Sequence, residues 1–376
     1  MQYRRFGRTN LNLSVFSLGT MRYLADEANA VKTVQAAIAL GINHLETAQG
    51  YGDSERFLRS ALRSELPLPR QQIYITTKVP PQPTAPQMRQ SIDRSLQTLG
   101  LDYLDGFAVH GVNTPEQLTW IQNPQGCMAA VREAIAAGKI RHVGFSTHAP
   151  LEIILKAIET DQFDFVNLHY YYFNPRNAAA IKRAYQKEMG VFIISPADKG
   201  GMLHHPPTRL TELCQPFSPL ELTYRFLLAD PRITTLSFGA AHPAELKILQ
   251  TLGDRTTPLT NLETQRFNAL SAEAEAQLAT DLCRQCFECL PCPEQIHIPE
   301  VLRLRNLAIA YDMTEFGQYR YGMFENAGHW FPGRRGDRCT DCGDCLPRCP
   351  EQLDIPQLLR DAHERLGGRT RRRLWG

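Results

Sequence analysis

The sequence lacks any long apolar run, although hydrophobic residues make up 43% of its 376 residues. A membrane-spanning helix needs about 20 consecutive apolar residues, and no stretch approaches that length. An excess of one charge is missing as well, since 41 basic side chains are balanced by 39 acidic ones. A nearly neutral chain lacks the basic excess typical of nucleic-acid binding. We therefore expect no membrane span and no nucleic-acid partner.

A targeting segment and a glycine-rich nucleotide motif are also absent. No signal peptide precedes the first predicted strand, and together with the cysteine content this favours a cytoplasmic protein. No G-x-G-x-x-G sequence follows that strand, which argues against a doubly wound open sheet. The one dense charge run is basic, at residues 369–373. Such runs are mostly solvated, and docking of an acidic partner is the alternative.

Cysteine is scarce except in two short runs. The first run is Cys-x-x-Cys-x-x-Cys-x-x-Cys-Pro, formed by Cys283, Cys286, Cys289 and Cys292. The second has one more residue before its last cysteine and is formed by Cys339, Cys342, Cys345 and Cys349. Three thiolates at this spacing can hold three corners of an iron-sulfur cube, and the cysteine before proline typically ligates the other cube. We therefore predict two 4Fe-4S clusters on these eight residues, with the fourth ligand of the first run left open by its shorter spacing.

Zinc and disulfides are the alternatives for these cysteines. Tetrahedral zinc needs only four thiolates, so neither run would need its third and fourth cysteine so close. Disulfides are disfavoured by the close spacing and by the expected reducing compartment. The flanks repeat as well, because residues 292–299 match residues 349–356, which indicates two half-modules built on one plan. Cys127 and Cys214 lie outside both runs and should pack as small apolar residues.

Residues 1–255 show a short apolar strand followed by a helix eight times, which predicts an α/β chain folded as a (β/α)8 TIM barrel. The predicted strands are 15–19, 44–48, 73–79, 104–110, 142–146, 165–169, 191–195 and 234–239. Residues 3–15 should form a hairpin at the barrel floor. Residues 256–280 are predicted to form a linker helix, and residues 281–376 a small, mainly helical two-cluster domain.

Local signals mark several helix ends. Thr84 and Ser218 each stand three residues before a Gln or Glu, the arrangement of a capping box at a helix start. Gly100, Gly138 and Gly190 stand where helices are predicted to stop.

Polar residues stand at the carboxyl ends of consecutive predicted strands, where TIM barrels place their active sites. They are Glu46, Tyr51, Lys78 and His110. A nearby ammonium lowers the tyrosine pKa from about 10 and makes the phenol a usable acid. The carboxylate would hold the lysine, and the histidine would orient a carbonyl oxygen. Each residue alone has a structural explanation in packing or surface charge, but their common position favours an active site.

These residues and their neighbours resemble the aldo-keto reductase superfamily over residues 1–255. The matching stretches, in family order, are 41–52, 76–78, 104–110, 143–146, 166–170, 195–196 and 238–240. The resemblance implies a nicotinamide-dependent reductase of small aldehydes and ketones. It implies that Tyr51 is the general acid, that Lys78 tunes it with Glu46 as partner, and that His110 orients the carbonyl. It further implies that the nicotinamide and pyrophosphate of NADP or NAD contact Ser146, Asn167, Ser195, Gly239 and Ala240.

Two positions depart from the family pattern. The family has aspartate where this chain has Glu46, and the extra methylene should shift the carboxylate by about 1.5 Å, toward or past Lys78. We therefore expect a specialised or decayed site. Residues 240–245 contain no arginine, the residue suited to clamping the additional phosphate of NADP, so NADP and NAD both remain open.

The cysteine module resembles helical two-cluster ferredoxin domains, and a branch of aldo-keto reductases carries a comparable tail together with the stretch at residues 199–203. Nicotinamide transfers two electrons as hydride whereas each cluster accepts one, and no flavin motif is evident. Two functions stay open. One is a carbonyl reductase whose clusters exchange electrons with an electron-transfer protein. The other is a degenerate barrel that acts as a scaffold for a two-cluster electron carrier or redox sensor.

Overall fold

The computed structural model describes residues 1–368, so the basic run at 369–373 lies outside the described residues. The chain divides into two compact units. Among the described residues, the first comprises residues 1–196 and 224–258, and the second comprises residues 197–223 and 259–368. The grouping of residues 197–223 with the C-terminal part was not anticipated from the sequence.

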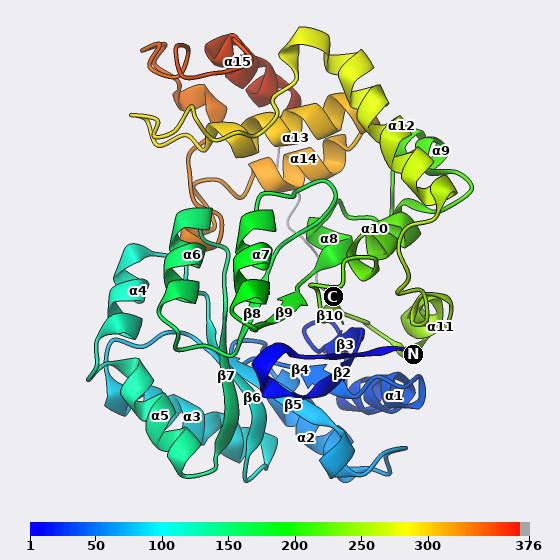
Figure 1. Cartoon of the computed structure of the whole chain (residues 1–376), viewed down its shortest axis with the longest axis vertical. Helices are drawn as coiled ribbons and strands as arrows, with labels where there is room; N and C mark the ends of the chain where they lie inside the picture. Colours follow the sequence, from blue (N-terminus) through cyan, green and yellow to red (C-terminus); the bar gives the residue numbers. More distant parts are fainter. Residues whose placement is uncertain (369–376) are drawn as a thin grey trace. The chain divides into compact units, whose positions relative to one another are not determined.

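The first unit is a closed barrel of parallel strands in the order β10-β3-β4-β5-β6-β7-β8-β9 (Figure 1). Its strands are β3 (Phe16–Gly19), β4 (His44–Glu46), β5 (Tyr74–Val79), β6 (Leu104–His110), β7 (Ile140–Ser146), β8 (Phe165–Leu168), β9 (Gly190–Ile193) and β10 (Thr235–Phe238). The last strand closes on the first, with Phe238 opposite Leu18. The predicted (β/α)8 barrel is therefore confirmed.

Helices follow the strands and surround the barrel (Figure 1). They are α1 (Glu27–Ala39), α2 (Ser54–Arg63), α3 (Ala85–Leu99), α4 (Pro115–Gln122), α5 (Cys127–Ala136), α6 (Leu151–Glu159), α7 (Ala178–Gln186) and α11 (Leu249–Leu252), with α8 (Pro196–Lys199) and α10 (Pro219–Leu228) spanning the division between the units. Short 3-10 turns are η1 (Gly7–Thr9), η2 (Arg70–Gln72) and η3 (Pro243–Ile248). Gly100 ends α3 in the left-handed region at φ 65°, as predicted.

Two local predictions were wrong. The Thr84 side chain forms no cap hydrogen bond to the α3 backbone, and its hydroxyl instead donates to Gln87 Oε1 at 2.7 Å. Gly190 is not a helix stop but the first residue of β9. A Cβ at Gly190 would stand 2.2 Å from Phe6 Cδ2, so the position is glycine because an aromatic ring lies against its backbone.

That ring belongs to the N-terminal hairpin of β1 (Tyr3–Arg5) and β2 (Asn12–Ser14), in which Tyr3 pairs with Ser14. Phe6 stacks on Phe165 with ring centroids 5.0 Å apart, at the start of β8. Arg4 donates hydrogen bonds to three backbone carbonyls, those of Leu228 (2.5 Å), Ile233 (2.6 Å) and Asp230 (3.0 Å). The hairpin thus closes the amino-terminal end of the barrel, as predicted.

The second unit is mainly helical. It contains α9 (Thr208–Cys214), α12 (Asn261–Leu278), α13 (Ile298–Tyr311), α14 (Thr314–Tyr321), α15 (Ile355–Leu366) and the 3-10 turns η4 (Ala279–Asp281), η5 (Gly328–Trp330) and η6 (Gly336–Arg338). A capping box between Thr260 and Glu263 starts α12, the helix predicted ahead of the cysteines. The Arg209 guanidinium of α9 pairs with Glu273 of α12, which ties residues 197–223 to this unit. Among residues 1–368, no helix is long and apolar enough to cross a membrane.

Candidate functional site

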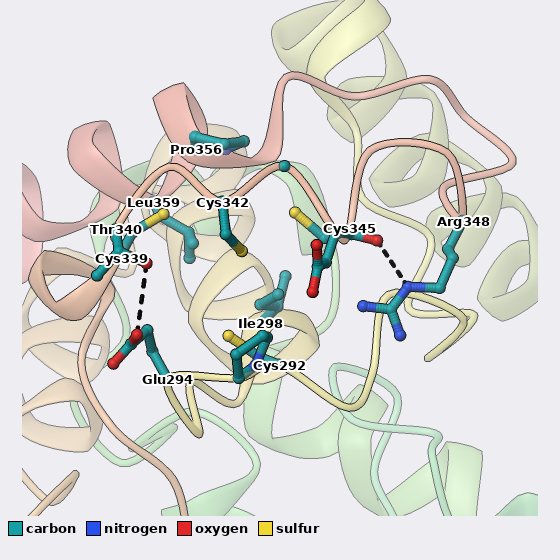
Figure 2. Close-up of a pocket in the computed structure, with 13 residues that line it drawn as sticks. Cys292, Glu294, Ile298, Cys339, Thr340, Cys342, Cys345, Arg348, Pro356 and Leu359 are labelled. Atoms are coloured by element: carbon teal, nitrogen blue, oxygen red, sulfur yellow. Dashed lines mark hydrogen bonds between the residues drawn. The ribbon is translucent and has the colours of Figure 1, made fainter.

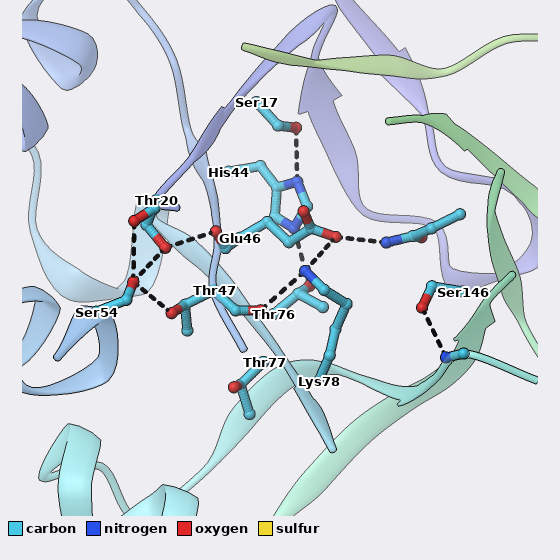
Figure 3. A network of polar contacts seen from close by, with 12 residues as sticks. Ser17, Thr20, His44, Glu46, Thr47, Ser54, Thr76, Thr77, Lys78 and Ser146 are labelled. Carbon is cyan, nitrogen blue, oxygen red and sulfur yellow. Dashed lines mark hydrogen bonds and ion pairs between the residues drawn. The ribbon is translucent and has the colours of Figure 1, made fainter. Parts of the chain in front are cut away.

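Glu46 and Lys78 form a buried ion pair at the carboxyl ends of β4 and β5. Lys78 Nζ lies 3.0 Å from Glu46 Oε1 and also donates to the Thr47 carbonyl at 2.9 Å (Figure 3). Only 2% of the Lys78 side chain and 4% of the Glu46 side chain are exposed. The longer Glu46 side chain therefore reaches Lys78 at ion-pair distance.

A third residue explains where the longer carboxylate goes. Asn167, near the end of β8, donates its Nδ2 to the same Glu46 Oε1. The Asn167 Oδ1 atom is buried and has no hydrogen-bond partner among the described residues. Glu46 thus joins the lysine on one side to the β8 asparagine on the other. The family resemblance implies that Asn167 contacts the cofactor, but the bond to Glu46 is not evident in the sequence, because it depends on the closure of the barrel.

Tyr51 and His110 complete the group. Lys78 Nζ lies 4.8 Å from the centroid of the Tyr51 ring, and the rings of Tyr51 and His110 meet edge to face with centroids 5.7 Å apart. Tyr51 is held in a tight turn, in which its N–H donates to the Ala48 carbonyl at 3.0 Å. The structure therefore brings together all four residues predicted at the strand ends.

The electrostatics of the group differ from expectation in one respect. Burial raises the pKa of Tyr51, and the opposing effect of the Lys78 charge does not overcome it, so the predicted lowering is wrong. Burial alone would lower the pKa of Lys78, but the negative charge of Glu46 and the contact with Tyr51 outweigh this effect and raise it. Burial also raises the pKa of Glu46 against the effects of Lys78 and Asn167. The lysine therefore stays cationic beneath a protonated phenol.

A polar layer lies in the barrel beneath the ion pair. His44 Nδ1 is 2.6 Å from Ser17 Oγ, and His44 Nε2 is 2.8 Å from Thr76 Oγ1 (Figure 3). Burial, reinforced by the charge of Lys78, lowers the pKa of His44 to about 3. Sequence analysis assigned no role to His44, because its partners come from strands on either side of β4.

The residues predicted to hold the nucleotide lie at the same end of the barrel. Ser146 stands opposite both His110 and Asn167 in the strand ladders, so the three side chains follow neighbouring strand ends. Ser195 follows β9 in the left-handed region at φ 51°. Gly239, followed by Ala240, comes directly after β10, and its carbonyl accepts a 2.7 Å hydrogen bond from Arg22 Nη1. Together these positions border one mouth of the barrel.

The cysteines of the second unit form two groups. Cys339, Cys342 and Cys345 line a pocket that is partly open to solvent, and Cys292 of the first run joins them (Figure 2). In the other group, burial raises the pKa of Cys283 to about 11, with further contributions from nearby Cys286 and Cys349. Cys289 lies close to Cys283 and Cys286. Each run thus contributes three cysteines to one group and its Cys-Pro cysteine to the other.

The two groups share one backbone plan, as the sequence repeat predicted. Left-handed residues recur at matching positions, in the pairs Gln285 and Asp341, Phe287 and Gly343, and Gln295 and Gln352. Each half then enters a helix, α13 or α15, whose N-cap side chain accepts from a backbone N–H three residues on. Within residues 1–368, no group of three His, Cys, Asp or Glu side chains is arranged so that it could bind a single metal ion.

The sequence of residues 16–271 matches the aldo/keto reductase family. The chain belongs to that family. Residues 282–353 match a second family, the 4Fe-4S dicluster domain, so this aldo/keto reductase carries a cluster-binding domain at its C-terminal side.

Individual relatives are distant. The chain is 23% identical to the uncharacterized oxidoreductase YqkF of Bacillus subtilis (strain 168), over 66% of this chain and 89% of that protein. It is 31% identical to the L-glyceraldehyde 3-phosphate reductase of Escherichia coli (strain K12), over 40% of this chain and 46% of that enzyme, less than half of its length. The aldo-keto reductase AKR11C1 from Bacillus halodurans (holo form) has a similar fold, with a TM-score of 0.62 and 24% identity over 71% of this chain and 95% of that chain.

Proposed function

We propose that the barrel reduces a small aldehyde or ketone with a nicotinamide nucleotide, at the site formed by Tyr51, Lys78, Glu46 and His110. The observation that carries this proposal is the 3.0 Å ion pair of Lys78 with Glu46, buried next to the Tyr51 ring. The L-glyceraldehyde 3-phosphate reductase relative is, by its name, also a carbonyl reductase.

The roles of the side chains follow from their charge states. A nicotinamide, when bound, would supply hydride to the carbonyl carbon, and the resulting alkoxide would need one proton to become an alcohol. Tyr51 provides that proton, since its raised pKa keeps the phenol protonated in the resting site. Lys78, kept cationic by Glu46, stabilises the phenolate that remains. His110, edge to face with Tyr51, orients the carbonyl oxygen toward the phenol.

The residues at the barrel mouth fit a nicotinamide nucleotide. Asn167 Oδ1 is a buried acceptor without a hydrogen-bond partner among the described residues, and an amide N–H donor such as a carboxamide would satisfy it. Ser146 and Ser195 would lie beside the same ring. Gly239 and Ala240 would border the diphosphate, in the loop after the eighth barrel strand, which in TIM barrels often takes part in phosphate binding.

We infer further that the eight clustered cysteines hold two 4Fe-4S clusters. Cys292 would join the three cysteines of the second run, and Cys349 would join those of the first, in the crossed pattern of two-cluster ferredoxins. Such clusters carry one electron each, so their exchange partner would be an electron-transfer protein or another one-electron carrier. The pocket at Cys292, Cys339, Cys342 and Cys345 is the observation that supports this inference.

Tyr51→Phe tests the enzymatic part. Turnover of a small aldehyde with NADH or NADPH, measured anaerobically, should fall by about 10²–10⁴-fold, the usual contribution of general acid catalysis. Nucleotide affinity should stay within about twofold. Tyr185→Phe is the matched control, because Tyr185 is 54% exposed on α7, and it should leave turnover unchanged. Equal turnover in the parent and Tyr51→Phe would favour the alternative, a barrel that only supports the clusters.

A further inference from the structure

A carboxylate is fixed beside the loop that follows β10. Arg22 Nη1 and Nη2 donate to the two carboxylate oxygens of Glu245 at 2.8 and 3.1 Å. The Ala241 N–H donates to the same carboxylate at 3.0 Å. Three hydrogen bonds therefore hold Glu245 in one orientation.

This carboxylate stands close to the residues proposed for the diphosphate. Arg22 also donates to the Gly239 carbonyl at 2.7 Å, and its Cδ would lie 3.6 Å from a Cβ built on Gly239. Arg22 therefore lies across Gly239 and places Glu245 next to it. A nucleotide whose diphosphate borders Gly239 and Ala240 would bring its adenosine half near Glu245.

The basic groups described beside this loop face Glu245 rather than the space where an additional phosphate would lie. NADP(H) differs from NAD(H) by a phosphate on the adenosine ribose, and nucleotide sites commonly receive that phosphate on an arginine and the free ribose hydroxyl on a carboxylate. Both Nη groups of Arg22 donate to Glu245. The ring of His242 also faces the carboxylate, with Nε2 3.8 Å from Glu245 Oε1. Arg22 and His242 are thus both directed at Glu245.

We propose that Glu245 excludes the ribose phosphate of NADP(H) and makes this reductase selective for NAD(H). The inference rests on the proposed binding of a nicotinamide nucleotide at the barrel mouth. It adds a specificity-determining residue that lies outside the catalytic group of four.

The test is a titration of the anaerobically purified full chain with NADH and with NADPH. Binding is measured by the fluorescence of the reduced nucleotide. The parent protein should bind NADH at least about tenfold more tightly than NADPH, because like charges in contact cost that much or more. Glu245→Gln removes the charge and nearly preserves the shape of the side chain. It should lower the ratio of the dissociation constant for NADPH to that for NADH by about tenfold. Glu245→Asp keeps the charge and should keep the preference for NADH.

The matched control is Glu152→Gln, which removes one negative charge from an exposed pair with Lys156 on α6 and should leave the ratio unchanged. A parent protein that prefers NADPH, an unchanged ratio in Glu245→Gln, or equal loss of selectivity in Glu245→Asp and Glu245→Gln would each overturn the inference. Failure of both nucleotides to bind the parent protein would instead overturn the proposed function, and the inference with it.

Discussion

Glu46 and Lys78 lie far apart in the sequence and meet because β4 and β5 are paired, whereas Cys339, Cys342 and Cys345 are brought together by a single short loop. The barrel group therefore depends on the closed sheet and on burial, since its ion pair is almost fully removed from water. The cysteine groups depend on local left-handed turns, such as those at Asp341 and Gly343, and are only partly buried. Damage to either should leave the other intact, because the barrel strands and the eight clustered cysteines belong to different compact units.

Lys78→Met should give the largest effect. It leaves the Glu46 carboxylate buried without its cation, which typically costs about 3–5 kcal/mol of unfolding free energy. Aldehyde turnover should fall by about 100-fold or more, because the phenolate of Tyr51 loses its counter-charge. Thermal unfolding and turnover measure the two effects, while iron content should not change. The double variant Lys78→Met with Glu46→Leu should recover stability without recovering turnover; recovery of both would show that the ion pair is only structural.

Cys292→Ser tests the crossed ligand pattern. The parent protein should contain about eight iron and eight sulfide, and the variant about four of each. The cluster lost should be the one at the pocket of the second run, so its paramagnetic resonance signal should match that lost in Cys342→Ser. Cys127→Ser and Cys214→Ser are the controls, since both residues are buried outside the groups and should leave iron unchanged. If the signal lost in Cys292→Ser instead matches the one lost in Cys286→Ser, Cys292 ligates the same cluster as the other cysteines of the first run.

Glu46→Asp should have an intermediate effect. The shorter carboxylate cannot hold both Lys78 and Asn167 in their present positions, so turnover should decrease by about tenfold, equivalent to about 1.4 kcal/mol of transition-state stabilisation. The change should appear in kcat more than in nucleotide affinity. A gain in turnover would instead indicate that Glu46 marks a decayed site, which the departure from the family pattern first suggested.

The smallest expected effect concerns pH and His44. Its folded pKa of about 3 lies below the ordinary value of 6.5, so an unfolded chain binds a proton that the folded chain does not. The contribution of neutral His44 to the free energy of unfolding is therefore fully present above pH 6.5 and is lost as the pH falls toward 3. The Tm should decrease by a few degrees between pH 6.5 and 5.5. His44→Gln should flatten this slope, whereas His205→Gln, at an exposed position, should retain it. Parallel slopes in all three proteins would contradict the prediction.

The sequence was sufficient to predict features that recur along the chain, and residues that stand at or just after the ends of strands. Apolar strands and their spacing identified the barrel, and the strand-end positions of Tyr51 and Lys78 identified the group at its mouth. Features that depend on contact across the closed barrel were not visible, such as the bond from Asn167 to Glu46. The same holds for Arg22 and Glu245, which meet only because β10 closes beside β3.

The second unit consists of two separate segments, residues 197–223 and 259–368, and this has a consequence for the synthesis of the protein. Chains leave the ribosome at about 5–20 residues per second, and N-terminal parts fold first. The barrel cannot close until β10 has emerged, because that strand pairs with β3. By then α9 has been synthesised, but α12, which pairs with it through Arg209 and Glu273, has not. We expect α9 to remain unpaired with α12 for several seconds. A chaperone that binds the nascent chain should therefore contact residues 208–214 until α12 has been synthesised.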